Sequence, residues 1–319
     1  MKNSNLAAAK RAKNDEFYTC REDIEAELAH YADSFRGKTV YCNCDDPDVS
    51  EFWKFFQRNF TAWGLKRLIA THYEPDAANY SYMIEINPGD AQTMEPVKKL
   101  IQSNGDFRSV ACIELLKQAD IVVTNPPFSL FREYMALLIR YQKMFLVMGN
   151  KNAFTYREVF PLVRDNQIWP GVTSINGGRW MIVPSHVVSD KARLDKQGRR
   201  VLNIAGVCWF TNMDHWKRHV SLELTRVYYG HEQEYPGYDN YAAIEVGRVQ
   251  DIPGDYDGVM GVPITFLDKY CPEQFEIIGA TESEGRGFSA GLWDETSGVS
   301  QPLIHGQRRY KRLFIQRKM

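Results

Sequence analysis

Four consecutive residues, Asn125-Pro126-Pro127-Phe128, have types and spacing that suit chemistry. This tetrapeptide, which we name the NPPF motif, directly follows an apolar, β-branched run at residues 121–124 that predicts a buried strand. Because open α/β sheets bind ligands beyond the carboxyl ends of their strands, the NPPF motif is placed where a substrate would lie. A proline turn that simply leaves a strand is the alternative interpretation.

The residue types of the NPPF motif suit the activation of a planar amine, whose lone pair is delocalised into its ring. Carbonyl oxygens from the Asn125 side chain and the Pro126 backbone can accept both amino hydrogens. They would favour the pyramidal, nucleophilic form of the nitrogen as charge develops on it. The two prolines stiffen the loop, and Phe128 offers a face on which a base can stack. No general base is required by this scheme.

The elements around the motif predict an α/β domain. Residues 15–165 alternate between helical and strand patterns, as in an open, mostly parallel, doubly wound sheet. The predicted buried strands lie at residues 39–44, 68–72, 121–124 and 145–148. From about residue 166 the helical periodicity fades into short β-like runs, at 180–183 and 207–210 among others. We expect the last strands of the sheet to lie in this second half.

Three helix starts carry the pattern of a capping box, in which a capping residue precedes a Glu by three positions. The expected caps are Thr19, Asp48 and Thr155. Apolar side chains then follow at helical spacing in each of the first two helices. Asp45, Asp46 and Asp48 raise the alternative of a metal site, but we expect Asp48 to act as a helix cap and predict no metal.

The composition fits an ordinary soluble protein, with 44% hydrophobic and 25% charged residues among 319. No apolar run approaches the roughly 18 residues that a membrane span needs, and the N-terminus lacks the apolar stretch of a signal peptide. The six cysteines show no C-x-x-C pair and no zinc spacing. We therefore expect a cytoplasmic protein with reduced thiols, in which Cys42 and Cys44 are small buried residues, and without a membrane partner.

The formal net charge is −1, yet the charges are segregated. Residues 1–13 carry four basic residues and no acid, and residues 301–319 carry six basic residues and no acid. Basic ends could contact phosphates, whereas a solvated tail is the alternative for the N-terminal one. Apolar residues interleave with the C-terminal cations, which favours an ordered strand there.

The chain resembles a known family, the EcoRI-type adenine-specific modification methylases, over nearly its whole length. The resemblance rests on the motif region 121–132 and on four further segments, at 15–19, 41–47, 105–109 and 258–266. It implies a Rossmann-like fold that binds S-adenosyl-L-methionine and a smaller, β- and loop-rich target-recognition region. The implied activity is methylation of the amino nitrogen of adenine in double-stranded DNA, with Asn125, Pro126, Pro127 and Phe128 at the catalytic centre. Such a base must be flipped out of the duplex to reach the cofactor.

The resemblance also implies a cofactor site. Phe17, Tyr18 and Thr19 match the segment that closes over the methionine part of the cofactor, and Asp45, Asp46 and Pro47 take the place of the first cofactor loop. Glu74 would bond the ribose hydroxyls. Asp106, followed by Phe107, matches the acidic residue that contacts the cofactor's adenine; a turn aspartate is the alternative. The first loop has no glycine, unlike that of the family at large, so its contact atoms stay open.

We expect a basic N-terminal arm at 1–14, a catalytic domain at 15–212 with a DNA-facing loop at 185–200, and a target-recognition region at 213–319. The enzyme is expected to act as a monomer. The expected DNA contacts are Lys191, Arg193, Arg199, Arg200, Arg308, Arg309, Lys311 and Arg312. For the loop at 185–200, a solvated turn is the alternative.

Two classes of function besides DNA adenine methylation remain possible from the residues. The same tetrapeptide would suit another planar amine, such as cytosine, an RNA adenine or a protein glutamine amide. A DNA-binding protein with a vestigial methyltransferase fold is a third class, which the intact Asn125 and Phe128 disfavour. The amino-acid sequence does not indicate which DNA site is recognised. It also does not indicate whether the protein is paired with a restriction enzyme, solitary or phage-borne.

Overall fold

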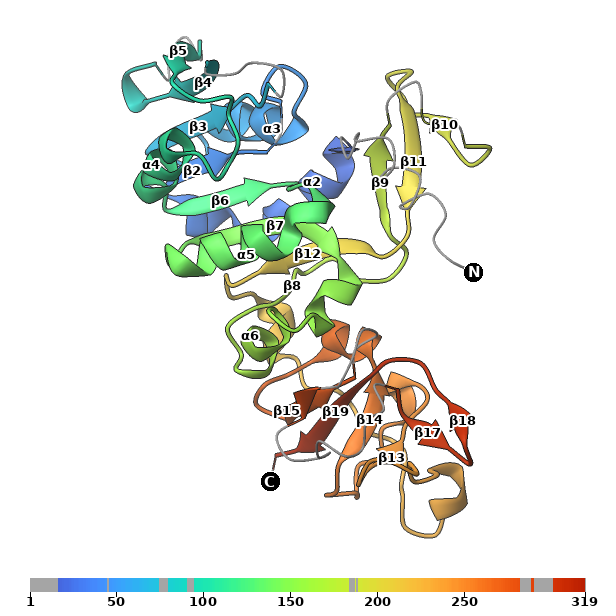
Figure 1. Ribbon diagram of the computed structural model, residues 1–319. Coiled ribbons are helices and arrows are strands. Elements are labelled where there is room, and N and C mark those ends of the chain that lie inside the picture. The colour runs from blue at the N-terminus through green and yellow to red at the C-terminus, as the bar shows by residue number, and fades with distance from the viewer. Residues whose placement is uncertain are drawn as a thin grey trace. The chain divides into compact units, whose positions relative to one another are not determined.

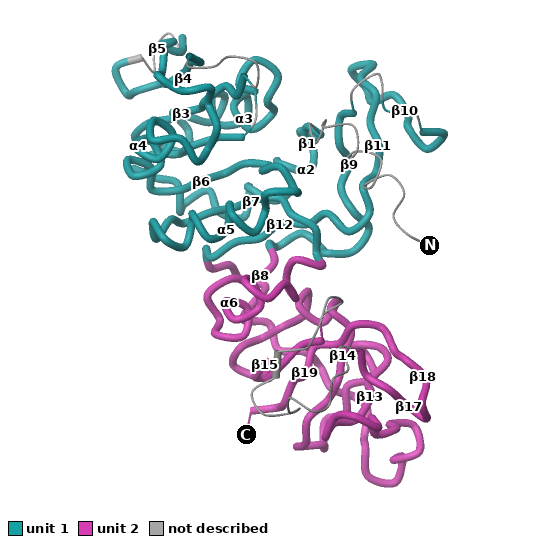
Figure 2. The backbone as a smooth tube through the Cα atoms, in the orientation of Figure 1, with its two compact units in different colours: residues 1–151, 171–213 teal, residues 152–170, 214–319 magenta. Residues whose placement is uncertain are grey.

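The computed structural model describes residues 17–44, 46–74, 80–90, 95–183, 187, 189–281, 288–289 and 301–318. The chain forms two compact units, coloured separately in Figure 2. Unit 1 comprises residues 1–151 and 171–213, and unit 2 comprises residues 152–170 and 214–319. The segment 152–170, which we expected in the catalytic domain, is therefore part of unit 2. The predicted arm at 1–14 lies outside the described residues.

Unit 1 is built on a mixed sheet (Figure 1). The strands that unit 1 contributes to this sheet are, in order, β5 (Val97–Ile101), β4 (Ser81–Ile86), β3 (Arg67–Thr71), β2 (Thr39–Cys42), β6 (Ile121–Thr124), β7 (Met144–Asn150) and β12 (Val207–Thr211). The four expected buried strands are β2, β3, β6 and β7, which pair in parallel. The flanking strands β4, β5 and β12 pair antiparallel. The prediction of a mostly parallel sheet is thus correct for its centre only. The connection at 72–80, between β3 and β4, is too short for the crossover that a parallel pair requires.

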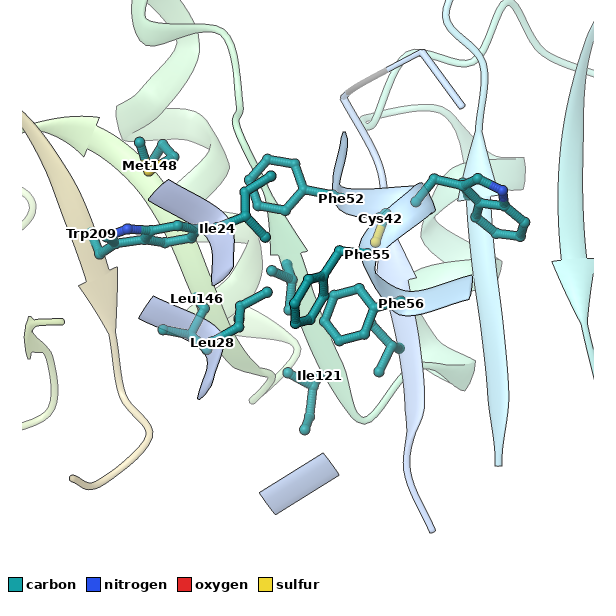
Figure 3. Packing of buried hydrophobic residues seen from close by; sticks show 14 of the residues in the cluster. Ile24, Leu28, Cys42, Phe52, Phe55, Phe56, Ile121, Leu146, Met148 and Trp209 are labelled. Atoms are coloured by element: carbon teal, nitrogen blue, oxygen red, sulfur yellow. The ribbon is translucent and has the colours of Figure 1, made fainter. Parts of the chain in front are cut away.

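Helices cover both faces of this sheet. They are α2 (Arg21–Leu28), α3 (Glu51–Asn59), α4 (Val110–Gln118) and α5 (Phe131–Arg140). On one face, Phe52 of α3 meets Trp209 of β12 edge to face, with ring centroids 5.9 Å apart (Figure 3). The next strand residue, Phe210, packs against Phe131 of α5 at 4.9 Å. Since successive strand residues point to opposite faces, α3 and α5 lie on opposite sides, and unit 1 is an α/β domain wound on both faces.

Two of the three expected capping boxes are wrong because the capping residue has another role. Thr19 belongs to a short strand that pairs with Met181, so Cys20 takes the N-cap position of α2 without a side-chain hydrogen bond. The Thr155 hydroxyl donates to the backbone oxygen of Asn152 at 3.0 Å. The helix that follows it, α6 (Phe160–Arg164), begins later than expected.

The third box is wrong by two residues. Ser50 caps α3, and its hydroxyl accepts a hydrogen bond from the Trp53 amide at 3.3 Å. The Asp48 carboxylate instead accepts a hydrogen bond from the Tyr82 hydroxyl at 2.8 Å. Asp48 is therefore not the helix cap that we expected.

A second, smaller sheet of unit 1 begins near the start of the described chain. Its strands, in order, are β1 (Tyr18–Thr19), β9 (Arg179–Ile182), β11 (Arg200–Ile204) and β10 (Arg193–Leu194), all antiparallel. The sheet ties residues 18–19 to the β9–β11 ribbon (Figure 2). Phe17, which directly precedes β1, is thereby held in a defined position.

Unit 2 holds short strands and 3₁₀ turns around a second apolar core. Its main sheet runs β13 (Ile244–Glu245), β14 (Met260–Pro263), β19 (Arg312–Arg317), β15 (Phe275–Ala280), β16 (Phe288–Ser289). A separate hairpin pairs β17 (Leu303–Ile304) with β18 (Gln307–Arg308), and β8 (Trp169–Pro170) precedes the return to unit 1. Phe314 of β19 packs on Tyr241 with centroids 4.7 Å apart, which anchors the C-terminal strand in this core.

The remaining elements are one-turn or two-turn 3₁₀ helices. They are η1 (Ala29–Phe35), η2 (Pro88–Asp90), η3 (Phe128–Leu130), η4 (Lys151–Thr155), η5 (Trp216–His219), η6 (Glu232–Glu234), η7 (Val249–Asp251) and η8 (Ile264–Lys269). Within the described ranges, none of the helices is both long and apolar enough to cross a membrane.

Candidate functional site

The NPPF motif lies at the carboxyl end of β6, as expected. The Asn125 side-chain nitrogen donates a hydrogen bond to the Phe17 backbone oxygen at 2.5 Å. This bond orients the amide, because its nitrogen must face the carbonyl and its oxygen must face the other way. The Asn125 Oδ1 atom is buried and accepts no hydrogen bond from any described residue. A buried acceptor without a donor is costly, so Asn125 Oδ1 at this strand end is a candidate to accept a hydrogen bond from a ligand.

The rest of the motif supports this acceptor. Pro126 is buried, and Pro127 leads into η3, where its backbone oxygen accepts a hydrogen bond from the Leu130 amide at 3.0 Å. Phe128 is partly buried and packs against the core of unit 1. Part of its ring is therefore held in place while part stays exposed, as a stacking surface requires.

The neighbouring strand β2 contributes a second, buried network. The Thr124 hydroxyl donates to the Asn43 backbone oxygen, and the Tyr134 hydroxyl donates to the Asn43 side-chain oxygen at 2.5 Å. Burial raises the pKa of Tyr134 well above its ordinary value, which keeps the hydroxyl a donor. Next along the chain, Cys44 has a φ of 61°, in the left-handed region. The β2 end is thus fixed against β6 and α5 where the candidate cofactor loop begins.

A histidine that the sequence analysis did not single out lies where β2 and β3 end. His72 Nδ1 is 3.3 Å from the Asp46 carboxylate, and His72 Nε2 is 3.6 Å from the Glu74 carboxylate. Its ring stacks on Tyr82, with centroids 4.8 Å apart and planes at 12°. His72 therefore brings two of the predicted cofactor residues together. The only available signal was its place at the end of a predicted strand that precedes Glu74.

The loop at 103–107 closes against the same strand end. The Glu74 amide donates to the Asn104 backbone oxygen at 2.8 Å. Gly105 has a φ of +85°, and a Cβ there would lie 1.8 Å from the His72 backbone oxygen. Only glycine allows this close approach. The predicted cofactor residues Glu74 and Asp106 are consequently held near one another.

Asp106 and Phe107 are placed differently from each other. The Asp106 carboxylate accepts hydrogen bonds from the Arg108 guanidinium at 2.9 and 2.7 Å and from the Arg108 amide at 2.8 Å. These hydrogen bonds from Arg108 hold the pKa of Asp106 below its ordinary value. Phe107 is buried and meets Tyr134 edge to face at 5.0 Å. Phe107 is thus a core residue that fixes the loop, and Asp106 keeps an ionised carboxylate at the sheet edge.

The N-terminal cofactor segment lies beside the motif. Phe17 packs partly against the core and offers its backbone oxygen to Asn125. Thr19 is buried, and its hydroxyl has no hydrogen-bond partner among the described residues. Tyr18 is half-buried in β1. In the first cofactor loop, Pro47 is buried, while Asp45 lies outside the described residues.

The sequence of the chain matches that of a known protein family. A model of the family described as adenine-specific methyltransferase EcoRI matches residues 5–318 of the chain. The chain belongs to this family. The identification made from the NPPF motif and the four accompanying segments is confirmed.

Curated relatives of this methyltransferase family cover most of the chain. It is 50% identical over 289 residues to Type II methyltransferase M.EcoRI of Escherichia coli, covering 86% of this chain and 89% of the relative. It is 41% identical over 316 residues to Type II methyltransferase M.MpnI of Mycoplasma pneumoniae, covering 97% of each. Type II methyltransferase M.MgeORF184P of Mycoplasma genitalium is 36% identical over 320 residues, covering 97% and 98%. No solved structure matches the chain.

In this methyltransferase, the basic residues expected near 185–200 do not share one environment. Lys191 and Arg193 are exposed, and the Arg193 guanidinium lies 3.5 Å from the centroid of the Trp180 ring. Arg199 instead pairs with Asp195 at 2.7 Å and with Glu51 at 2.6 Å. Two carboxylates neutralise this cation. Arg199 therefore has a structural role and is not the phosphate contact that we expected. Residues 184–186 and 188 lie outside the described residues, and Arg200 is half-buried in β11.

The C-terminal cations also divide into two groups. Arg308 and Arg309 are exposed. The Lys311 ammonium is partly buried and donates to the Thr155 hydroxyl at 3.2 Å. Arg312 is buried and forms an ion pair with Glu245. Arg312 is therefore a core cation, not the phosphate contact that its place in a basic run suggested.

The described residues contain no group of three or more His, Cys, Asp or Glu side chains that could hold a metal ion. All six cysteines are free thiols. Cys42 is buried in β2, as expected, whereas Cys44 lies past the strand end and is partly exposed. The cysteines therefore form no disulfide that would fix the site.

Proposed function

We propose that this protein transfers a methyl group from S-adenosyl-L-methionine to the exocyclic amino nitrogen of an adenine flipped out of double-stranded DNA. The observation that carries the proposal is the Asn125 side chain. Its nitrogen is occupied by the Phe17 carbonyl, and its buried oxygen has no donor among the described residues. An amino group of the substrate would supply that donor.

The Asn125 oxygen acts on the amino group during the reaction. Together with the Pro126 carbonyl it accepts the two amino hydrogens, which gain positive charge as the nitrogen attacks. Because Phe17 and the prolines already fix the acceptors, little reorganisation is needed when charge develops. The proton released after transfer leaves from nitrogen toward solvent, without a dedicated general base. This arrangement favours an aromatic amine over an oxygen or carbon nucleophile.

The predicted cofactor residues fit S-adenosyl-L-methionine, whose sulfonium supplies an electrophilic methyl group. The Thr19 hydroxyl is buried without a partner, which marks a place for a polar ligand atom. The carboxylates of Asp46 and Glu74 stand on either side of His72 at adjacent strand ends, where they would accept hydrogen bonds from ribose hydroxyls. Asp106 stays ionised beside Arg108 and would contact the adenine ring of the cofactor.

The fold supports the same proposal. We assign unit 1 to the Rossmann-like methyltransferase type, in which ligands bind where parallel strands end. The candidate residues of the cofactor and the substrate follow β2, β3 and β6, which are neighbours in the sheet. Residues 214–319 would then form the target-recognition region, and the enzyme would act as a monomer without a metal ion.

DNA would be held by cations that no carboxylate neutralises. Arg193, Arg308 and Arg309 are exposed and form no ion pair among the described residues. Lys191, which is also exposed, is a further candidate in the segment that contains Arg193. Phosphate contacts from such residues supply most of the affinity of a protein for duplex DNA. Phe128 would replace part of the stacking that the flipped base loses.

Nucleoside analysis tests this proposal directly. Duplex DNA is incubated with the protein and methyl-labelled S-adenosyl-L-methionine and is then digested to nucleosides. We expect the label in N6-methyl-2′-deoxyadenosine, whether or not EDTA is present. Label in N4-methylcytosine, or in RNA but not in DNA, would assign another substrate. Absence of label from every nucleic acid would favour a non-catalytic DNA-binding protein.

A further inference from the structure

The β17–β18 hairpin is a short ribbon with a tight, two-residue turn. Leu303 pairs with Arg308, and Ile304 pairs with Gln307. The two turn residues, His305 and Gly306, have φ values of 50° and 72°. Positive φ at both positions is the turn geometry that matches the natural twist of a hairpin. The ribbon therefore has a defined end.

Two side chains of one loop clamp this turn. The Asp239 carboxylate accepts hydrogen bonds from the His305 amide at 3.2 Å and the Gly306 amide at 2.7 Å. The Asn240 side chain accepts from the Leu303 amide at 2.9 Å and donates to the Gln301 backbone oxygen at 3.2 Å. The first strand and the tip of the ribbon are thus fixed by residues far away in sequence.

The ribbon is also anchored to the core of unit 2. Ile304 is 2% exposed and belongs to the cluster formed by Tyr238, Tyr241, Ala243 and Phe314. Beyond the ribbon, the Arg309 amide donates to the Pro302 backbone oxygen at 2.8 Å. A surface hairpin with this many tertiary contacts keeps its shape, so its exposed side chains start from fixed positions.

The side chains that follow the turn of the hairpin face solvent. Gln307, Arg308 and Arg309 are exposed, and the Tyr310 ring is 86% exposed. Neither arginine forms an ion pair with a described residue. By contrast, Arg248 pairs with Asp251 at 2.8 Å. The hairpin therefore presents unneutralised guanidinium groups, an amide and an aromatic ring on one rigid support.

We propose that the β17–β18 hairpin enters the major groove of duplex DNA and reads base edges through Gln307, Arg308 and Arg309. This inference rests on the proposed function, because it takes double-stranded DNA as the substrate. The major groove admits a two-stranded ribbon. There an arginine fork matches the two acceptors of guanine, and a glutamine matches the acceptor and donor of adenine. Tyr310, at the edge of the ribbon, contacts the sugar-phosphate backbone or a thymine methyl group.

The fixed shape of the hairpin favours contacts to base edges over contacts to phosphates. A phosphate contact carries no sequence information and needs only a cation within reach. Gln307 carries no charge and so adds nothing to the attraction for phosphates, while the Asp239 carboxylate holds the turn through the Gly306 amide. A fixed turn is useful where side chains must meet base edges in a defined register.

A sequence-resolved methylation assay tests the inference. The full chain methylates a duplex library with randomised bases, and sequencing that detects modified adenine gives the preferred site. In Arg308→Ala and Arg309→Ala, at least one position of the site should lose its base preference, with discrimination falling about tenfold or more. Gln307→Ala should relax a different position. Asp239→Ala, which removes the clamp but no cation, should relax the same positions as the arginine variants.

The matched control is Arg157→Ala, which removes another exposed arginine of unit 2 that forms no ion pair among the described residues. It should leave the site preference unchanged. If the hairpin variants methylate the wild-type site with undiminished base preference, the inference is overturned while the proposed function stands. If the wild-type protein methylates no DNA in the library, the proposed function itself fails.

Discussion

The side-chain nitrogen of Asn125 donates a hydrogen bond to the backbone oxygen of Phe17, a residue 108 positions earlier in the chain. This contact joins the predicted catalytic motif to the predicted cofactor segment and orients the amide oxygen as a free acceptor. Phe17 directly precedes β1, which pairs with β9 of the small sheet. The small sheet thus fixes the group that orients the Asn125 amide.

Asn125→Ala should lower the methylation rate by about 10² to 10³ or more, because it removes an acceptor that acts as charge develops on nitrogen. Single-turnover kinetics with labelled cofactor would measure this, and calorimetry with S-adenosylhomocysteine should show nearly unchanged binding. Asn125→Asp, which keeps an acceptor but loses the donor to Phe17, should retain more activity than the alanine variant. Near wild-type rates in Asn125→Ala would refute the assignment of the catalytic centre.

Phe128→Ala should act mainly on the flipped base. Loss of the stacking face costs about 1 to 3 kcal/mol per base, so the extruded state should be less populated. A duplex with 2-aminopurine at the target position would report this as weaker fluorescence, because that base brightens on unstacking. Phe128→Trp should preserve the signal. An equal fluorescence change in the wild type and in Phe128→Ala would show that the ring does not stack on the base.

His72→Gln should weaken cofactor binding, since His72 lies between the carboxylates of Asp46 and Glu74. Loss of a contact to charged groups is expected to raise the KM for S-adenosyl-L-methionine by about tenfold, while kcat and the KM for DNA change little. The matched control is His219→Gln, in which the replaced histidine of unit 2 also lies between two carboxylates. A fall in kcat alone would argue against a positioning role for His72.

Cys44 should be the first cysteine to react with N-ethylmaleimide, because the other five are buried. Burial raises the pKa of the Cys20 thiol to about 12, so that thiol stays protonated and unreactive at neutral pH. Since Cys44 directly precedes the predicted cofactor loop, S-adenosylhomocysteine should slow its modification. Peptide mass spectrometry would locate the adduct. Equal labelling of Cys44 with and without the ligand would separate this loop from the cofactor site.

The two groups of C-terminal arginines should differ in phenotype. The double variant Arg308→Gln and Arg309→Gln should weaken binding to the preferred DNA site by about tenfold or more, because two base contacts are lost. Arg312→Gln should instead lower stability by about 3 kcal/mol or more, because the largely buried Glu245 would lose its cationic partner. Fluorescence anisotropy with the preferred site and urea unfolding would measure the two effects. An unchanged affinity in the double variant would place both arginines away from DNA.

The sequence by itself determined the central strands and the location of the chemistry. β2, β3, β6 and β7 are continuous apolar, β-branched runs, a pattern typical of parallel strands buried on both faces. The NPPF motif follows one of them without a gap, so its place at a strand end required no tertiary information. These features are local: each is encoded within a few consecutive residues.

The tertiary structure decided the features in which two interactions compete for one side chain, and those in which the partner is distant in sequence. Thr19 and Asp48 have the right spacing for helix caps, but strand pairing and the Tyr82 hydroxyl occupy them, so the helices begin elsewhere. Arg199 and Arg312 read as free cations in their basic runs. Besides the nearby Asp195, Arg199 pairs with Glu51, 148 residues away in sequence, and Arg312 pairs with Glu245, 67 residues away; only the fold brings these distant partners together. His72 gained its candidate role in the same way, because its neighbours lie on separate strand ends and converge when the sheet forms.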